Sequence, residues 1–101
     1  MAETAFTVTL TRDFEDLVPL FVENRRKELE SLRSALAAGR YDKLQQLGHR
    51  MKGVGSTYGF DRVSILGGLI ADGATATNRE ALEARIAEYA EYLARVRVVY
   101  E

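Results

Sequence analysis

The residues best suited to chemistry gather around the single histidine of the chain, His49. A neutral imidazole nitrogen is a good nucleophile at physiological pH, and a phosphoryl group placed on it keeps a high transfer potential. At about 100° per residue, His49 lies roughly 160° away from the apolar stripe of its own predicted helix. That stripe consists of Leu44, Leu47, Met51, Val54 and Tyr58. We therefore expect the imidazole to face solvent, where a partner can reach it.

The neighbours of His49 on this polar face suit a phosphoryl group. Lys52, three residues on, projects to the same side of the helix and supplies positive charge for phosphoryl oxygens. Gly53, four residues on, leaves open space beside the ring, although glycine costs roughly 1 kcal/mol against alanine inside a helix. Arg50 lies further round the helix and is a weaker candidate for that contact. The predicted docking surface around His49 consists of Gln45, Gln46, Arg50 and Ser56.

The elements that must position this face are predicted to be helices, because alanine, leucine, glutamate and arginine abound and the 101 residues include one proline. The first regular helix is expected to begin within a few residues of Pro19 and to end at Gly39, after a lead-in over 11–18. The second is expected over 41–58, with Gly59 as its stop. The short connections favour antiparallel neighbours.

The third helix is predicted over 61–72. Asp61 can cap its start, Phe60 and Ile65 have the spacing of a hydrophobic staple, and Gly73 can close its end. These three signals together define a short helix that follows the His49 helix directly.

The fourth helix has the clearest start, a capping box over 77–80 in which Thr77 and Glu80 satisfy each other's amide groups. Its apolar stripe, with spacings of four and three, extends to the end of the chain and consists of Leu82, Ile86, Tyr89, Leu93, Val96 and Tyr100. The cluster Arg25-Arg26-Lys27, followed by Glu28 and Glu30, is interpreted as a solvated charged surface of the first helix.

These elements predict one all-α domain over 1–101, an antiparallel up-down four-helix bundle. The bundle is expected over about 13–100. Residues 1–12 are expected to form a short N-terminal arm or lead-in helix, because the alternation from Phe6 to Thr11 fits a strand but no second strand is predicted to pair with it. No apolar stripe is left over once the bundle closes, which favours a monomer.

Composition excludes several classes of function. Fourteen basic and fifteen acidic residues leave a net charge of -1, so no overall field would gather nucleic acid or anionic lipid. The chain has no cysteine, and one histidine without a second ligand at suitable spacing does not make a metal site. Ser56 and His49 lack an orienting acid or oxyanion pocket for hydrolysis. No leader or membrane-spanning run is present, so a cytoplasmic location is expected.

The run His49-Arg50-Met51-Lys52-Gly53 resembles the histidine-containing phosphotransfer (HPt) domains of multistep phosphorelays, which carry lysine and glycine three and four residues after the histidine. The family continues with a small residue and then an apolar or aromatic residue followed by glycine, and Gly55 and Tyr58-Gly59 fill those places. The resemblance covers the predicted bundle, roughly 13–100.

This resemblance implies a phosphohistidine carrier in a two-component system, without the ATP-binding or kinase motifs of an enzyme. His49 would accept a phosphoryl group through its outer ring nitrogen from a receiver-domain aspartate and pass it to another receiver. Lys52 would steady the phosphoryl oxygens, and Gly53 would leave room for the partner. The implied partners are receiver domains of response regulators, a hybrid histidine kinase, or both. No cofactor is implied for the chain, because Mg²⁺ would belong to the partner receiver.

Two alternatives stay open. The first is a non-catalytic helical interaction module that docks a partner through the His49 face. The second is the phosphoacceptor domain of a chemotaxis-type histidine kinase.

The sequence departs from the family pattern in the residue that orients the histidine ring. Many relatives orient the histidine with a glutamine or other polar residue on the following helix, and this chain has no glutamine after Gln46. Asp72 is the candidate for that task.

Overall fold

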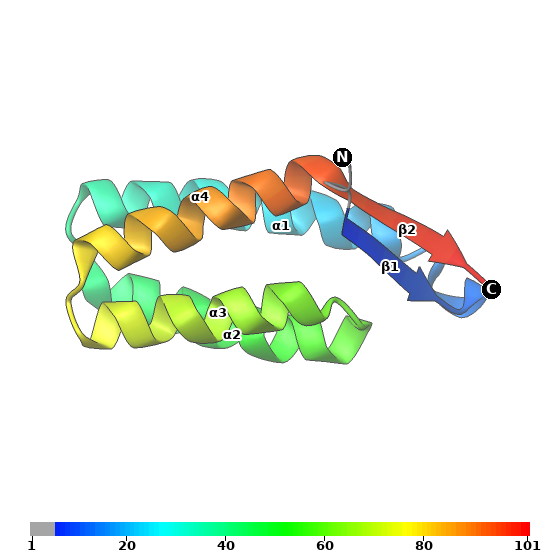
Figure 1. Cartoon of the computed structure of the whole chain (residues 1–101), viewed down its shortest axis with the longest axis horizontal. Helices are drawn as coiled ribbons and strands as arrows, with labels where there is room; N and C mark the ends of the chain where they lie inside the picture. Colours follow the sequence, from blue (N-terminus) through cyan, green and yellow to red (C-terminus); the bar gives the residue numbers. More distant parts are fainter. Residues whose placement is uncertain (1–5) are drawn as a thin grey trace.

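The computed structural model describes residues 6–101, and most of these residues form four helices. They are α1 (Val18–Ala37), α2 (Tyr41–Tyr58), α3 (Asp61–Thr75) and α4 (Arg79–Arg95). Figure 1 shows α1 beside α4 and α2 beside α3, with the α1–α2 and α3–α4 connections at one end of the bundle and the α2–α3 connection at the other. The predicted helical bundle is confirmed.

The ends of α1 and α2 lie where local chemistry places them. Pro19 sits in the first turn of α1, where its missing N–H removes no helical hydrogen bond. Gly39 and Gly59 follow α1 and α2 with φ angles of 69° and 81°, a left-handed conformation that glycine adopts without strain. A short 3₁₀ helix, η1 (Arg12–Phe14), precedes α1 and corresponds to part of the predicted lead-in.

The predicted start and end signals of α3 are wrong in detail. Phe60, not Asp61, occupies the N-cap, and no side chain caps the helix. Ile65 is 59% exposed while Phe60 is buried, so the two residues form no staple. The helix also continues past Gly73 to Thr75, because one glycine weakens a helix but does not end it when the helix packs on a neighbour.

The start of α4 is set by a different residue from the one predicted. Asn78 is the N-cap, and its side-chain oxygen accepts a hydrogen bond of 3.1 Å from the amide of Ala81. Thr77, the expected cap, has a φ of 51° and lies in the turn. The capping-box prediction over 77–80 is therefore wrong by one position, since asparagine is as good a cap as threonine.

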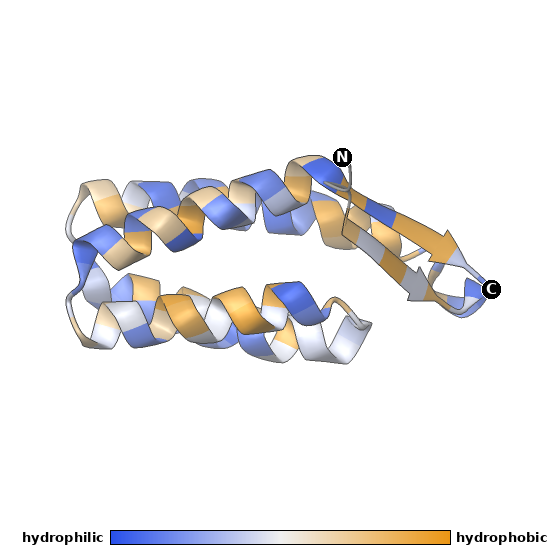
Figure 2. Cartoon of the chain, viewed as in Figure 1, coloured by the Kyte–Doolittle hydropathy of each residue, from blue (hydrophilic) through white to orange (hydrophobic). Residues whose placement is uncertain are grey.

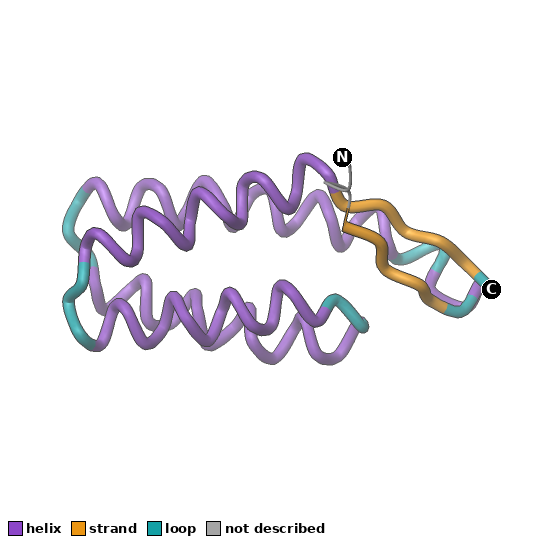
Figure 3. Tube along the Cα trace, in the orientation of Figure 1, coloured by secondary structure: helices purple, strands orange, loops and turns teal. Residues whose placement is uncertain are grey.

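The largest difference from the prediction is a two-stranded parallel sheet. β1 (Phe6–Leu10) pairs with β2 (Val96–Tyr100), and Phe6 lies opposite Val96. The fourth helix thus ends at Arg95, and the predicted arm over 1–12 is a strand over its described part, while residues 1–5 lie outside the described residues. Figure 3 shows the two strands in orange at one end of the bundle.

The reason for this difference is that the spacing of the last apolar residues fits two periods. Val96 and Tyr100 continue the helical stripe, but Val96, Val98 and Tyr100 also alternate as in a strand, and valine and tyrosine favour strands. Alternate residues of both strands are half-buried or buried against the bundle. Figure 2 shows apolar residues as separate bands along each helix and over most of β2, where one hydrophilic band interrupts them.

The core includes two charged residues that were expected on the surface. Arg25 and Glu28 are 8% and 5% exposed, and Glu28 accepts a hydrogen bond from Tyr89 of α4. The apolar stripe of α1 has spacings of three and four, and these two positions fall between Phe21 and Leu32 on that stripe. The interpretation of this cluster as a wholly solvated surface is therefore wrong for Arg25 and Glu28.

Candidate functional site

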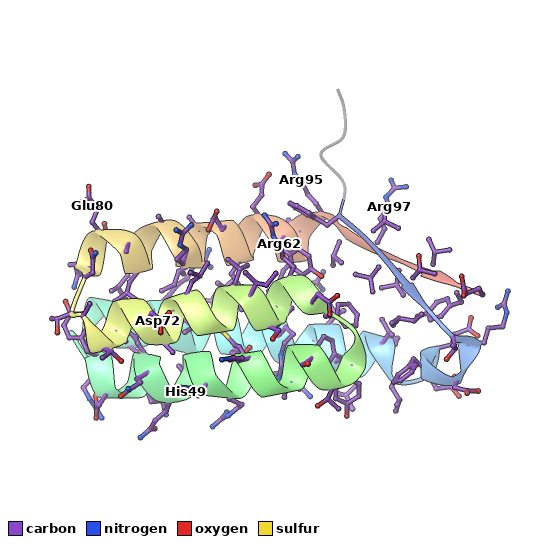
Figure 4. The ribbon with its side chains drawn as sticks, turned by 60° about the horizontal axis from the view of Figure 1, so that its bottom comes forward. His49, Arg62, Asp72, Glu80, Arg95 and Arg97 are labelled. Carbon is purple, nitrogen blue, oxygen red and sulfur yellow. The ribbon has the colours of Figure 1, made fainter. Side chains whose placement is uncertain are left out.

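His49 lies in the middle of α2, on its outer side. The residue is exposed, while Leu47 and Met51 on the opposite side of the helix are 3% and 0% exposed. Figure 4 shows His49 on the side of the bundle that comes forward when α2 and α3 face the reader. The core does not use this side chain, as the spacing of the apolar residues predicts.

Glycines bring α3 unusually close to the helix that carries His49. A Cβ atom on Gly48 would lie 2.6 Å from the backbone nitrogen of Ala71, and one on Gly67 would lie 2.6 Å from the carbonyl oxygen of Gly48. Real Cβ atoms do not approach backbone atoms so closely, so only glycine fits at both positions. Gly55 repeats this contact further along α2, against the backbone nitrogen of Ser64 at 2.5 Å.

Lys52 lies beside this contact, on the edge of α2 that faces α3. The side-chain oxygen of Ser64 donates a hydrogen bond of 2.8 Å to the Lys52 carbonyl oxygen. The Lys52 Cδ atom lies 3.8 Å from the place of a Cβ atom on Gly68, so the lysine stem runs over a residue without a side chain. Lys52 is exposed and forms no ion pair within residues 6–101.

Gly53 differs from the glycines that face α3. A Cβ atom built on Gly53 would meet no atom within 4 Å, and the residue is exposed. Helix packing therefore gives no reason for glycine at this position. The space beside it is open to an approaching molecule.

The other residues of the predicted docking surface lie in three different surroundings. The side-chain nitrogen of Gln45 donates a hydrogen bond of 3.0 Å to the hydroxyl of Thr75 on α3, so this glutamine also joins the two helices. Gln46 and Ser56 are exposed. Arg50 lies on the side of α2 that faces α1, where it lines a surface hollow with Glu28.

The ring of His49 forms no hydrogen bond with another residue of the described part of the chain. Asp72 is exposed on α3 and appears on the same side of the bundle as His49 in Figure 4. No hydrogen bond joins the two, so the structure does not support Asp72 as the residue that orients the ring.

Comparison with known proteins assigns the chain to a family. A family model described as the Hpt domain matches residues 16–98, which is most of the chain. The chain belongs to the Hpt domain family. No curated protein and no solved structure matches the chain. Hpt domains act in histidine phosphotransfer within the phosphorelays of two-component systems, as carriers rather than kinases, and they interact with receiver and kinase domains.

This Hpt domain also contains a buried polar cluster that sequence reasoning missed. The Tyr89 hydroxyl donates a hydrogen bond of 2.9 Å to Oε1 of Glu28, and Nε of Arg25 lies 3.3 Å from the same oxygen. Burial raises the pKa of Glu28, against the opposing influence of Arg25 and Tyr89. Burial likewise raises the pKa of Tyr89. The sequence feature that indicates this cluster is that Arg25 and Glu28 occupy positions of the apolar stripe of α1.

Other kinds of site receive no support from the described residues of the Hpt domain. Residues 6–101 contain no group of three or more histidine, aspartate or glutamate side chains that could hold a metal ion. In the same range, no helix is long and apolar enough to cross a membrane.

Proposed function

We propose that this Hpt domain is a phosphorelay intermediate in which His49 carries the phosphoryl group. The observation that carries the proposal is the open face at the middle of α2. An exposed imidazole lies there with a lysine free of ion pairs three residues on and with open space at Gly53. Domains of this family supply the reaction class, and His49 is the only imidazole in the chain.

The proposed step exchanges one bond to phosphorus for another. The lone pair of the outer ring nitrogen of His49 forms the N–P bond while the bond between phosphorus and the aspartyl oxygen of a receiver breaks. The aspartate leaves as a carboxylate, and the ring keeps its proton on the other nitrogen. Lys52 offsets the charge of the phosphoryl oxygens, and Mg²⁺ is held by the acidic pocket of the receiver. The reverse step passes the group to a second receiver.

The proposed setting follows from the same face. The partners are receiver domains of response regulators, a hybrid histidine kinase, or both, and they dock on the surface formed by Gln46, Arg50, Ser56 and the open space at Gly53. The domain acts as a monomer in the cytoplasm, as an antiparallel up-down bundle that needs no cofactor of its own. α2 and α3, which approach closely at glycines, form the base beneath the docking face.

The test is transfer of labelled phosphate to the purified domain from a phosphorylated receiver, followed by assay of acid-labile label. We expect label on the wild type and none on His49→Gln, which removes the nucleophile at an exposed position. Circular dichroism should show equal helix content for the two proteins. Acid-labile label that persists on His49→Gln contradicts the proposal, because no other histidine is present.

The two other hypotheses predict different results. A non-catalytic docking module would bind receivers through the same face and accept no label from any of them. A chemotaxis-type phosphoacceptor domain would take label from an ATP-binding kinase domain and none from a phosphorylated receiver. Only the proposed relay intermediate exchanges label with receivers in both directions.

A further inference from the structure

A groove lies between β1 and the beginning of α3, well away from His49. It has a volume of about 450 Å³ and is lined by residues 6–9 of β1, by Gly59, Asp61 and Arg62 at the start of α3, and by Tyr92 of α4. Gly59 lies ten residues beyond His49, which is about 15 Å along α2 at 1.5 Å per residue. Phosphotransfer at His49 does not use this groove.

One wall of the groove is a strand edge that no other strand covers. The carbonyl oxygen of Leu10 accepts a hydrogen bond of 3.0 Å from the amide of Glu101, so the backbone groups of Leu10 face β2. Successive residues of a strand direct their backbone groups to opposite sides. The N–H and C=O groups of Thr7 and Thr9 therefore face away from β2. β1 pairs with β2 alone among the strands of residues 6–101, so this edge is free.

A second observation points to a polar ligand in the same groove. Tyr92 is 2% exposed, and its hydroxyl has no hydrogen-bond partner within residues 6–101. Burial raises the pKa of Tyr92 to about 12, so the hydroxyl stays protonated and can donate. A buried polar group without a partner is costly, and such groups are normally satisfied. The ring of Tyr92 packs on Phe6 of β1, with 5.2 Å between centroids.

The opposite wall adds unsatisfied donors. α3 has no side-chain cap, and the first N–H groups of a helix have no acceptor within the helix. The amides of Asp61 and Arg62 are in this position. The helix dipole makes this end partly positive.

Arg62 lines the groove, and Arg97 lies opposite Thr7 on β2. Arg62 and Arg97 form no ion pair within residues 6–101, whereas Arg95 pairs with Glu91 at 2.7 Å. The guanidinium of Arg62 lies 5.2 Å from the ring centre of Phe6, which is opposite Val96, between Arg95 and Arg97. Figure 4 shows these three arginines toward the end of the bundle that carries the sheet. Asp61 is the single acidic residue that lines the groove.

We propose that this groove binds an extended acidic peptide segment of a partner protein, which pairs with the free edge of β1 as a third strand. The backbone of the segment would bond to Thr7 and Thr9, and one of its polar groups would accept a hydrogen bond from Tyr92. Its acidic side chains would lie near Arg62 and the start of α3. Strand addition of this kind takes affinity from main-chain hydrogen bonds and specificity from neighbouring side-chain pockets.

A second copy of this chain fits the groove less well than a peptide segment. In a second copy, the same edge of β1 lies beside the start of its own α3, so pairing two such edges would also bring the two α3 helices together. The strand β1 also carries no charge, whereas Arg62 lines the groove. Neither of these two objections applies to a free acidic segment of a partner protein.

The test titrates the ¹⁵N-labelled domain with the blocked peptide acetyl-Val-Glu-Val-Thr-Val-Glu-amide and follows its amide resonances. We expect saturable shifts at Thr7, Thr9, Asp61 and Arg62. A matched peptide with lysine in place of glutamate should bind about tenfold more weakly, which corresponds to about 1.4 kcal/mol. If no resonance shift saturates at peptide concentrations up to about 5 mM, far above the dissociation constant of a useful complex, the proposal is wrong.

Three variants separate the strand-edge contacts from the fold. Thr7→Pro removes an outward N–H at an edge position that tolerates proline, and it should weaken peptide binding about tenfold or more. Thr7→Ala keeps that N–H and should bind like the wild type. Tyr92→Phe should bind several-fold more weakly while the domain stays folded, because its hydroxyl has no partner to lose. Wild-type affinity in both Thr7→Pro and Tyr92→Phe contradicts the proposal.

Two further measurements exclude other occupants. Shifts at Thr7 and Thr9 that depend on domain concentration without peptide, together with a dimer in sedimentation, would show a second copy in the groove. Shifts at Asp61 and Arg62 with inorganic phosphate alone, without any peptide effect at Thr7 and Thr9, would show a simple anion site. Either result overturns the assignment to an acidic peptide. A positive peptide result is independent of whether His49 carries phosphate.

Discussion

The hydroxyl of Tyr89 on α4 donates a hydrogen bond of 2.9 Å to the buried carboxylate of Glu28 on α1. The same carboxylate oxygen lies 3.3 Å from Nε of Arg25. The contact joins two helices that are distant in sequence and places a charged group where apolar side chains would otherwise meet. Its second oxygen has no hydrogen-bond partner within residues 6–101, so the cluster is only partly satisfied.

Removing the donor from this contact should destabilise the bundle. Tyr89→Phe leaves the Glu28 carboxylate without its hydrogen bond in a buried place, which costs about 1–3 kcal/mol. The matched control is Tyr92→Phe, which removes a buried hydroxyl that has no partner and should not reduce stability. Urea unfolding followed by circular dichroism measures both. Equal losses in the two variants would show that the Tyr89 hydroxyl contributes no net stability through Glu28.

The pH dependence of stability should report the raised pKa of Glu28. Because the folded state then binds more protons than the unfolded state, the free energy of unfolding falls as the pH rises from the ordinary value near 4.5 through the raised pKa. Glu28→Gln should remove this fall. Glu30→Gln, at an exposed position of the same helix, should keep it. Urea unfolding at several pH values tests the sign, and a wild-type advantage over Glu28→Gln that grows with pH would contradict it.

Two glycines of α2 should respond in opposite ways to the same substitution. Gly48→Ala places a methyl group 2.6 Å from the Ala71 backbone nitrogen and 2.7 Å from the Gly67 carbonyl oxygen, so we expect a loss of several kcal/mol or misfolding. Gly53→Ala meets no atom within 4 Å and should gain about 0.5–1 kcal/mol from helix propensity. Thermal and urea unfolding measure both. A destabilised Gly53→Ala would mean that the open space there is a structural need.

Lysine substitutions on α2 should separate phosphoryl transfer from general surface charge. Lys52→Ala should slow transfer to His49 by about tenfold, because it removes a positive charge that offsets the phosphoryl oxygens, and it should leave the fold intact at an exposed position. Lys43→Ala removes the same charge six residues before His49 on the same helix and should transfer like the wild type. Rapid-quench transfer from a labelled receiver gives both rates. A similar slowing in the two variants would assign the effect to electrostatic attraction alone.

The helices were predictable because their signals are local. The stripe that opposes His49, the glycine after each of α1 and α2 and the proline at the start of α1 each act within a few residues. The exposure of His49 and Lys52 follows from the same spacing, so the residues of the site could be gathered on one face without knowledge of the fold.

The rest depends on partners that are far away in the chain. The spacing of Val96 and Tyr100 fits both a helix and a strand, and the strand forms where Phe6–Leu10 lies beside it, but neither segment alone shows this pairing. The burial of Glu28 depends on Tyr89, which lies 61 residues away. The partner of Gln45, Thr75 on α3, likewise depends on how α2 and α3 meet. The local periodicity of the sequence predicts none of these contacts.

The parallel pairing of β1 and β2 also bears on the order in which the chain folds. Phe6 and Val96 are about 90 positions apart, and closing a loop of that length costs entropy that few early contacts can offset. Helices and their neighbouring contacts form over short separations, so they can precede it. The sheet therefore completes only when all four helices have brought their ends together. Its amide protons should then become protected last during refolding, which makes the sheet a reporter of the finished bundle.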